Sequence, residues 1–542
     1  SWQEISPDLT LNLKDHQQSS GGVAIDNLMT YDGSLTFAIA ESPHEPGTIW
    51  VGTNDGQVQL TRDDGATWSN VTENIPDLPP WGTVGNIEVS RFDEETAYIS
   101  VDLHQMGNFD PWIYKTSDLG ESWTRISDGI PQSPHSFVHV VREDPKRPGM
   151  LFAGTDNALW MTLDDGANWS KLRLNMPPAP VYWLTIQERF DDLVVATYGR
   201  GFYILDDIGS LRGLDEETTA ANTLFDVRDA YRWQEVQGVK TESSMSTGRD
   251  PRYGASIDYF VAGDDEGRVS IQIEDGTGEV VRTLSGPGGA GLNRVYWDLR
   301  HPSPDLPRFY TKPPGRDWVP LEQGGDRVVY VWDIDLIRGQ RGPLAVPGSY
   351  TVRATIGGEE FTKPLVVLKD PYSTGTLDMI AEQVAFSLGM RDQISDITSV
   401  IERMEHTRVQ LGAAQAALAG DPEAVEVRTE IERLTAVATE LEGALVDVNL
   451  TGAREDSFRN PMRLYGRFSA LASDVDWKGS DFVPTTQQRE VHQVLTDRLE
   501  GAKQAIQTFL DGELAQLNDR LRALGRPAIV SDDFEDDLED GL

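Results

Sequence analysis

The chain has 542 residues, enough for two to four domains, and 39% of them are hydrophobic and 25% charged, as in ordinary soluble proteins. Acidic residues exceed basic ones by 88 − 47 = 41, so the net charge of −41 disfavours nucleic acid and anionic membranes as partners. No apolar run is long enough to span a bilayer, and the absence of cysteine excludes disulfides, thiolate metal sites and a cysteine nucleophile.

The first 210 residues contain one phrase, Thr-x-Asp-x-Gly-x-x-Trp, three times. Its copies start 55 and 46 residues apart, which is the size of a four-stranded propeller blade. Glycine adopts the backbone angles of a tight turn, aspartate ties the turn by hydrogen bonds, and tryptophan packs on neighbouring strands. We therefore expect a structural role for Thr61, Asp63, Gly65, Trp68, Thr116, Asp118, Gly120, Trp123, Thr162, Asp164, Gly166 and Trp169.

This phrase resembles the Asp-box of the BNR-repeat β-propellers, a family that includes sialidases, xyloglucanases and the luminal domain of sortilin. The resemblance covers roughly residues 1–210 and implies about four blades, the last of which (residues 182–207) has strands but no Asp-box. Such propellers have more blades, so we expect the others upstream or in a second chain. The opening SWQEISPDL matches the tail of each repeat, which favours a preceding copy upstream. We also expect a signal peptide upstream of Ser1, and hence an extracellular or periplasmic protein.

Residues 222–370 alternate apolar and polar side chains with period two, which predicts a β-sandwich. RVSIQIEDGTGEVVRTLSGPGGAGLNRVYWDLR resembles the Ig-like domain of flagellar hook-capping proteins. The acidity of the chain leaves calcium binding open. In this domain GDDEGR and EDGTGE are candidate calcium loops, although both are first of all typical of hairpin turns.

Residues 374–526 change to a helical period and predict an antiparallel α-helical bundle, which could also mediate oligomerisation. Asp421 and Pro422 are expected to start its second helix. Residues 527–542 form an acidic tail. Three apolar stripes are expected to face the bundle core: Ile394, Ile397, Ile401, Met404 and Leu411; Ile431, Leu434, Leu441 and Leu445; and Val491, Leu495, Leu499, Ile506, Leu510, Leu514 and Leu517. The fold class is thus multidomain and mainly β.

The resemblance implies that ligands bind on the propeller face opposite the Asp-boxes, which is built from the loops that follow the second and fourth strands of each blade. Aromatic rings beside polar groups suit a sugar or a peptide. The candidate binding residues in these loops are Trp81, His104, Trp112, His135, Tyr182, Tyr198 and Arg200.

Glycoside hydrolysis requires two carboxyl groups across the scissile bond. The candidates are Asp110, in the longest of these loops, with Asp156 or Asp55 as its partner. Turn chemistry alone also explains aspartate at all three positions. A sialidase is disfavoured because its set of three arginines is missing.

Two functions therefore remain open. The first is a secreted, non-catalytic protein that binds a glycan or polypeptide and serves as a scaffold, as the sortilin resemblance implies. The second is a glycoside hydrolase of xyloglucanase type. The sandwich and helices that follow the propeller depart from the paired propellers of xyloglucanases, which favours the first.

Overall fold

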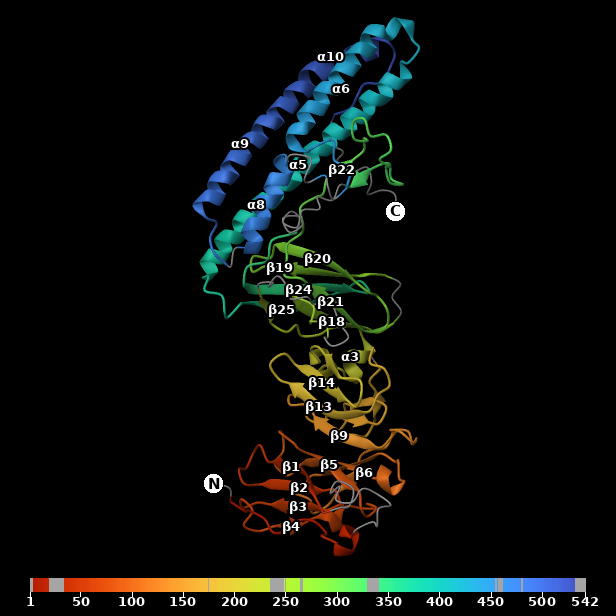
Figure 1. Ribbon diagram of the computed structural model, residues 1–542, viewed down its shortest axis with the longest axis vertical. Coiled ribbons are helices and arrows are strands. Elements are labelled where there is room, and N and C mark those ends of the chain that lie inside the picture. Colours follow the sequence, from red (N-terminus) through yellow and green to blue (C-terminus); the bar gives the residue numbers. More distant parts are fainter. Residues whose placement is uncertain are drawn as a thin grey trace. The chain divides into compact units, whose positions relative to one another are not determined.

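The structure is a computed structural model of the chain (Figure 1). It describes residues 3–18, 34–173, 175–233, 248, 250–263, 267–328, 341–453, 456, 462–478 and 481–531. The chain divides into two compact units: Ser1–Asp226 with Asp258–Asp264 and Ala290–Leu292, and Val227–Ile257 with Asp265–Gly289 and Asn293–Leu542. The finer division drawn from the sequence stays a prediction.

Three successive sheets of the first unit are four-stranded antiparallel meanders of consecutive strands. The first contains β1 to β4: Thr36–Glu41, Ile49–Thr53, Val58–Thr61 and Ser69–Asn70. The second contains β5 to β8: Thr83–Val89, Ala97–Asp102, Trp112–Thr116 and Thr124–Arg125. The third contains β9 to β12: Val138–Glu143, Leu151–Thr155, Leu159–Thr162 and Ser170–Lys171. Short 3-10 turns lie at Lys14–Gln17, Thr72–Asn74 and His104–Met106.

A fourth sheet follows in the same pattern, with strands β13 (Val181–Gln187), β14 (Asp192–Thr197) and β15 (Phe202–Leu205). The sequence predicted strands here without the repeated phrase, and the sheet confirms the strands. The first strands β1, β5, β9 and β13 of successive sheets are neighbours, as in consecutive blades of a β-propeller. The first unit is therefore a mainly β structure of four blade-like sheets.

Glycines in the second strands let neighbouring sheets approach closely. A Cβ added to Gly52 in β2 would lie 2.5 Å from Val84 Cγ1 in β5. One added to Gly154 in β10 would lie 2.5 Å from Val181 O in β13. Because real Cβ atoms do not approach other atoms this closely, both positions require glycine.

The three repeated phrases fold into the same turn after the third strand of each sheet. In the second copy the hydroxyl of Thr116 accepts from Gly120 N (2.9 Å) and donates to Asp118 Oδ1 (2.7 Å), and Ser122 N also donates to Asp118 (2.8 Å). Leu119 and Gly120 adopt φ of 56° and 86°. Corresponding hydrogen bonds recur around Thr61 and Thr162.

Each of these turn glycines packs against the tail of the preceding repeat, in what we call the glycine joint. An added Cβ would lie 2.2 Å from Ile5 O at Gly65, 3.2 Å from Val71 Cβ at Gly120 and 2.8 Å from Ile126 Cβ at Gly166. Ile5, Val71 and Ile126 each stand three residues after a tryptophan in the sequence. Two tryptophan indoles reinforce the joint, because Trp68 Nε1 donates to Ile5 O (3.1 Å) and Trp169 Nε1 to Ile126 O (2.7 Å). The opening segment thus occupies, against the first sheet, the place that a repeat's tail occupies against the next.

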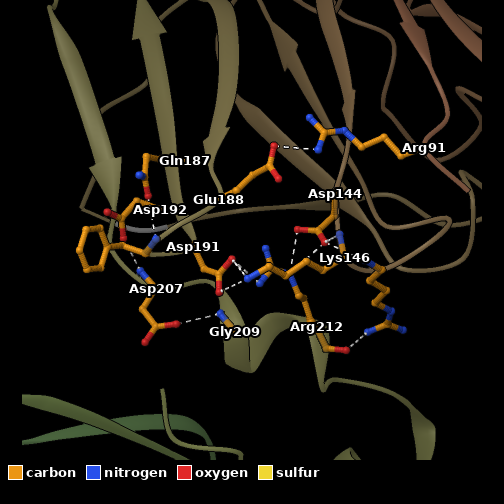
Figure 2. Close-up of polar contacts among 12 residues, drawn as sticks. Arg91, Asp144, Lys146, Gln187, Glu188, Asp191, Asp192, Asp207, Gly209 and Arg212 are labelled. Atoms are coloured by element: carbon orange, nitrogen blue, oxygen red, sulfur yellow. Dashed lines mark hydrogen bonds and ion pairs between the residues drawn. The ribbon is translucent and has the colours of Figure 1, made fainter. Parts of the chain in front are cut away.

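Helix α2 (Gly209–Arg212) follows the fourth sheet and is held by a network of ion pairs (Figure 2). Arg212 Nε donates to both carboxylate oxygens of Asp144 at 2.9 Å, and Arg212 Nη1 contacts Asp191 at 2.8 Å. Lys146 also contacts Asp191, at 2.7 Å. Since Asp144 is fully buried, the charge of Arg212 and its shared Nε–H compensate the desolvation of this carboxylate. A short helix, α3 (Glu216–Ala220), comes next.

Two sheets follow helix α3. One has the order β17-β25-β24-β19-β20, with strands Ala230–Arg232, Glu359–Lys369, Gly348–Ile356, Val269–Glu274 and Val280–Gly286. The other has the order β16-β18-β21, with strands Thr223–Leu224, Ala255–Val261 and Gly291–Trp297. Trp297 and Tyr350 meet edge to face at 5.3 Å, so the two sheets contact each other through their buried side chains. A separate ribbon pairs β22 (Arg308–Phe309) with β23 (Arg327–Val328).

The C-terminal part is helical, as predicted: α5 (Leu377–Ala417), α6 (Val425–Leu445), α8 (Leu464–Lys478), α9 (Thr486–Phe509) and α10 (Ala515–Ala523), with a π-helical turn at Leu510–Leu514. The predicted start of the second helix is confirmed, because Asp421 caps a 3-10 turn, Pro422–Ala424, that leads into α6. The predicted stripes are buried or packed against the core, except that Val491 is 48% exposed. Most of the acidic tail lies outside the described residues.

Buried charges tie these helices together and to the segment around β22. Glu405 in α5 accepts from Tyr310 N (2.7 Å) and Thr311 N (2.6 Å). Arg408 Nη1 donates to both Glu405 and Glu442 of α6, each at 2.8 Å. Burial and the nearby charge of Glu405 raise the pKa of Glu442 well above its usual range.

Candidate functional site

One edge of the blade-like sheets gathers histidines, aspartates and aromatic rings. Because the strands are antiparallel, the end of each second strand lies beside the start of the first strand. This edge therefore carries Asp102 at the end of β6 and His104 after it, His135 before β9 and His139 in it, and Asp156 after β10. Tyr182 in β13 and Tyr198 after β14 join them. With Phe109 and Phe137 these residues form what we call the loop-face cluster.

His139 lies at the centre of the loop-face cluster, with its side chain 7% exposed. Its Nδ1 is 3.8 Å from Asp102 Oδ2, and its Nε2 is 3.6 Å from Asp156 Oδ1. Both distances exceed a normal hydrogen bond. The ring of Tyr182 stacks on the imidazole with centroids 4.0 Å apart.

Each of the two carboxylates also binds a more exposed histidine. Asp102 Oδ1 contacts His104 Nδ1 at 2.7 Å and accepts from the His104 backbone N–H at 2.9 Å. Asp156 Oδ2 contacts His135 Nδ1 at 2.8 Å. The side chains of His104 and His135 are 37% and 62% exposed. The result is a chain of alternating imidazoles and carboxylates, with the buried His139 at its middle.

Aromatic rings extend the cluster on both sides of His139. Phe137 stacks on His104 with centroids 4.6 Å apart and meets His139 edge to face at 5.1 Å. On the other side Tyr182 lies 5.4 Å from Tyr198. Tyr182 and Tyr198 are 46% and 71% exposed, so their rings are open to a ligand.

Burial lowers the pKa of His139, whereas the negative charges of Asp102 and Asp156 act in the opposite direction. The net effect is a lowered pKa, which keeps this imidazole neutral near pH 7. Among the described residues, no group of three or more His, Asp or Glu side chains is arranged to hold a metal ion.

Other predicted site residues lie apart from the cluster. Asp55 is 1% exposed and accepts from the Thr53 hydroxyl (2.5 Å), which fits a turn, and from Leu11 N (2.9 Å), which ties the opening segment to that turn. Trp112 is 6% exposed and lies under the guanidinium of Arg125, at 4.0 Å, within the sheet core.

The remaining predicted residues are nearer the surface. Trp81 has φ 67° and stacks on His16 at 4.5 Å. The backbone N–H of Asp110 donates to Asn108 Oδ1 (2.9 Å), and among the described residues no hydrogen bond or ion pair joins the Asp110 side chain to the cluster. Arg200 is exposed.

The sequence-based search missed Asp102, Phe109, Phe137 and His139. A signal for three of them was present in the sequence. Phe137 and His139 follow the candidate His135 at spacing two, which is typical of one side of an extended strand, although β9 itself begins at Val138. Asp102 precedes the candidate His104 by two residues.

One of the two candidate calcium loops, EDGTGE, lies in the described part of the chain. Asp275 accepts from Thr277 N (2.8 Å), the Thr277 hydroxyl (2.6 Å) and Glu279 N (3.1 Å), which is a hairpin turn. The centre of GDDEGR lies outside the described residues. None of the described helices is long and apolar enough to cross a membrane.

No family model matches the chain. An oligoxyloglucan-reducing end-specific xyloglucanase of Emericella nidulans is 26% identical over 129 residues, so the match spans 24% of this chain and 15% of that protein's length. The solved YCF48 bound to D1 peptide is 14% identical, covers 61% of this chain and 81% of its own, and gives a TM-score of 0.24. The GH74 xyloglucanase from Xanthomonas campestris is 15% identical, covers 41% and 32%, and gives 0.26. TM-scores this low do not establish a common overall arrangement.

Proposed function

We propose that this protein binds a glycan or polypeptide partner at the loop-face cluster of a propeller-type unit and acts as a scaffold without catalysis there. One observation carries the proposal: the buried imidazole of His139 lies between the carboxylates of Asp102 and Asp156. A glycosidase needs the space between its two carboxyl groups for the scissile bond, and for water if it inverts. Here a ring that is itself packed under Tyr182 fills that space.

The exposed rings of Tyr182 and Tyr198 offer the contact area that a partner requires. Tyrosine presents a flat apolar face together with a hydroxyl, and it loses little side-chain entropy on binding. His104 and His135 border these rings with exposed polar atoms. This mixture of flat rings and polar groups suits either a sugar or a peptide.

Carboxyls with a raised pKa lie elsewhere in the first unit. Burial raises the pKa of Glu88, which pairs with Arg142 at 2.5 Å, and that of Glu143, which accepts from the Tyr98 hydroxyl at 3.4 Å. A glycosidase acid has a raised pKa and must reach the glycosidic oxygen. Neither Glu88 nor Glu143 belongs to the cluster, so neither can protonate a ligand bound there.

A paired binding and hydrolysis assay tests this function. The full chain is applied to a glycan array and to a peptide array, and xyloglucan is incubated with it while reducing ends are measured. We expect saturable binding on one array, weakened about tenfold (~1.4 kcal/mol) by Tyr198→Ala and unchanged by Tyr372→Ala, an 88% exposed tyrosine elsewhere. No release of sugar is expected. Binding on neither array would contradict the proposal.

The alternative is a glycoside hydrolase of xyloglucanase type, and the similarity to the Emericella nidulans enzyme favours it. In that case xyloglucan would be cleaved, and Asp156→Asn or Asp102→Asn would abolish the release of reducing ends. The same assay therefore separates the two functions.

We also propose an identity for the repeated turns, an identity for the two-sheet region and a location for the protein. We infer that the repeated turns are the Asp-boxes of a BNR-repeat propeller, because glycine and aspartate occupy the same hydrogen-bonded places in all three. The two-sheet region is proposed to be an Ig-like domain. An extracellular or periplasmic location is proposed from the sequence resemblance alone.

Further blades are proposed to cover both end sheets, whether they come from the same protein or from a second chain. In β1, Ala38 packs in the core shared with the second sheet, so Phe37 and Ile39 point to the opposite face, 49% and 69% exposed. In β15, Tyr203 packs inward, and Phe202 and Ile204 are 77% and 59% exposed. Apolar side chains on both outer faces are what a neighbouring blade would bury.

A further inference from the structure

The fourth blade-like sheet lacks the outermost strand that the first three have. In each of those three sheets a two-residue strand, β4, β8 or β12, pairs with the third strand. Among the described residues no strand pairs with the outer edge of β15, the third strand of the fourth sheet. This edge is therefore open to pairing with another strand.

The side chains of β15 are exposed where the equivalent side chains of a complete sheet are buried. Phe202 and Val58 each pair with the last but one residue of the second strand, so they are equivalent, as are Ile204 and Leu60. Phe202 is 77% exposed and Val58 is 0% exposed. Ile204 is 59% exposed and Leu60 is 5% exposed. The third strand of the fourth sheet thus lacks the cover that a complete sheet and its neighbour provide.

The opening segment has the form of an outermost strand without the rest of its sheet. Gln3 and Glu4 stand between a tryptophan and the tail residue Ile5, as do the outermost strands Ser69–Asn70, Thr124–Arg125 and Ser170–Lys171 in their own repeats. Both residues are exposed and belong to no strand of the described chain. Ile5 is 46% exposed, whereas its counterparts Val71 and Ile126 are 7% and 9% exposed. The segment is therefore seated at the glycine joint, but no third strand covers it.

The complete sheets define the register in which these two incomplete parts fit. In each of them the backbone N–H of the tail residue donates to the third strand: Val71 N to Val58 O (3.0 Å), Ile126 N to Ile113 O (2.9 Å) and Leu172 N to Leu159 O (2.9 Å). The outermost strands pair in the same register in all three. Applied to the opening segment, this register pairs Gln3 with Ile204. It also directs the N–H of Ile5 to Phe202 O.

The two parts meet only between different copies of the chain. Within one copy the first and fourth sheets do not cover each other, because Ile39 and Ile204 remain exposed on their outer faces. The tail of the first sheet lies on the second sheet at Gly120, and these two sheets share one core. By the same geometry, a fourth sheet that pairs with the opening segment of another copy would lie against β1 of that copy. It would then bury Phe37 and Ile39.

We propose that two copies of this chain complete each other's fourth sheet, with Gln3–Glu4 of each copy as the outermost strand beside β15 of the other. A contact between two different surfaces forms a closed ring when its rotation closes. Two copies contribute four sheets each, and propellers typically have about four to eight blades. The inference rests on the proposal that further blades cover both end sheets, and it is independent of ligand binding at the loop-face cluster.

Cysteine cross-linking of the full chain tests this pairing, because the chain contains no cysteine of its own. The variants Gln3→Cys and Ile204→Cys are mixed in 0.5 M NaCl, which screens the net charge of −41, and are then oxidised. Paired residues of antiparallel strands have Cα atoms about 4.5–5.5 Å apart, within the range of a disulfide. We expect about fivefold more covalent dimer than from Gln3→Cys mixed with Val280→Cys, a 48% exposed residue on the edge strand β20.

A second cysteine pair, Glu4→Cys with Tyr203→Cys, follows from the same register and should also cross-link, even if Ile204→Cys weakens the contact. The unmodified chain should sediment as assemblies of no more than two copies in 0.5 M NaCl. Cross-linking of both pairs at the level of the control, or assemblies larger than two copies, would overturn the inference. In that event, self-association that Ile39→Glu weakens would leave the covering of the end sheets standing, whereas a strictly monomeric chain would contradict both.

Discussion

In the loop-face cluster, burial and two neighbouring carboxylates have opposite effects on the pKa of His139. Its pKa is lowered below the ordinary value of about 6.5, so the folded chain binds this proton less readily than the unfolded chain. The contribution of His139 to stability is therefore complete above about pH 6.5 and decreases as the pH falls below it. Acidification therefore destabilises the folded chain through the protonation of His139.

A histidine ring-proton NMR titration should place the pKa of His139 below about 6.5. Asp156→Asn should lower this pKa further, because it removes a negative charge that favours the imidazolium. Asp110→Asn, on the same face but outside the cluster, serves as the control and should leave the pKa unchanged. A His139 that titrates at or above 6.5, or a pKa raised by Asp156→Asn, would show this account to be wrong.

At the scale of single elements, the repeated turn depends on one buried hydroxyl. Thr116 is 1% exposed, and its Oγ1 accepts from the buried Gly120 N–H while it donates to Asp118. Leu119 is not glycine and has a positive φ of 56°, so these bonds hold an unfavourable backbone conformation in place.

Thr116→Val keeps the shape of the side chain but leaves the Gly120 N–H without its acceptor. We expect a loss of about 1–3 kcal/mol in the free energy of unfolding, measured by urea denaturation with tryptophan fluorescence, together with faster hydrogen exchange at Gly120. Thr124→Val, at an exposed threonine of the same sheet, should change the stability by less than about 0.5 kcal/mol. Equal effects of the two substitutions would refute the role of the hydroxyl.

Local patterns explain why the elements were predictable. Ile394, Ile397 and Ile401 repeat at helical spacing and are all fully buried, and Val352, Ala354 and Ile356 alternate and are buried in β24. The spacing between copies of the repeated phrase predicted the size of a blade. The site was predictable only in part, because Asp102 and Asp156 meet around His139 through the packing of different sheets. Trp112 and Asp55 have side chains that suit ligand binding, but both are buried. The type of a side chain alone does not reveal its burial.

At the scale of the molecule, the chain has apolar outer faces on β1 and β15 together with a large negative net charge. Exposed apolar faces favour association, whereas a net charge of −41 opposes it at low ionic strength. Salt screens the repulsion, since the Debye length falls from about 10 Å at 0.1 M to about 3 Å at 1 M. Association of the chain alone should therefore depend on salt.

Analytical ultracentrifugation should show weak, reversible self-association that increases between 0.05 and 0.5 M NaCl. Ile39→Glu and Ile204→Glu should each reduce it, because they place a charge on one of the two faces. Val530→Glu, at a 56% exposed valine of the second unit, is the control and should have little effect. A chain that stays monomeric at all salt concentrations would contradict the proposal that these faces accept further blades.

The glycine joint gives this association a direction. A contact in which one surface fits a different surface on the next copy can be repeated without end and produce fibres. At Gly65 that contact is already filled from within the chain by Ile5, whose carbonyl also accepts from Trp68. The opening residues thus fill this joint from within the chain, so an incoming copy meets the joint occupied and can use only the faces and edges of the sheets.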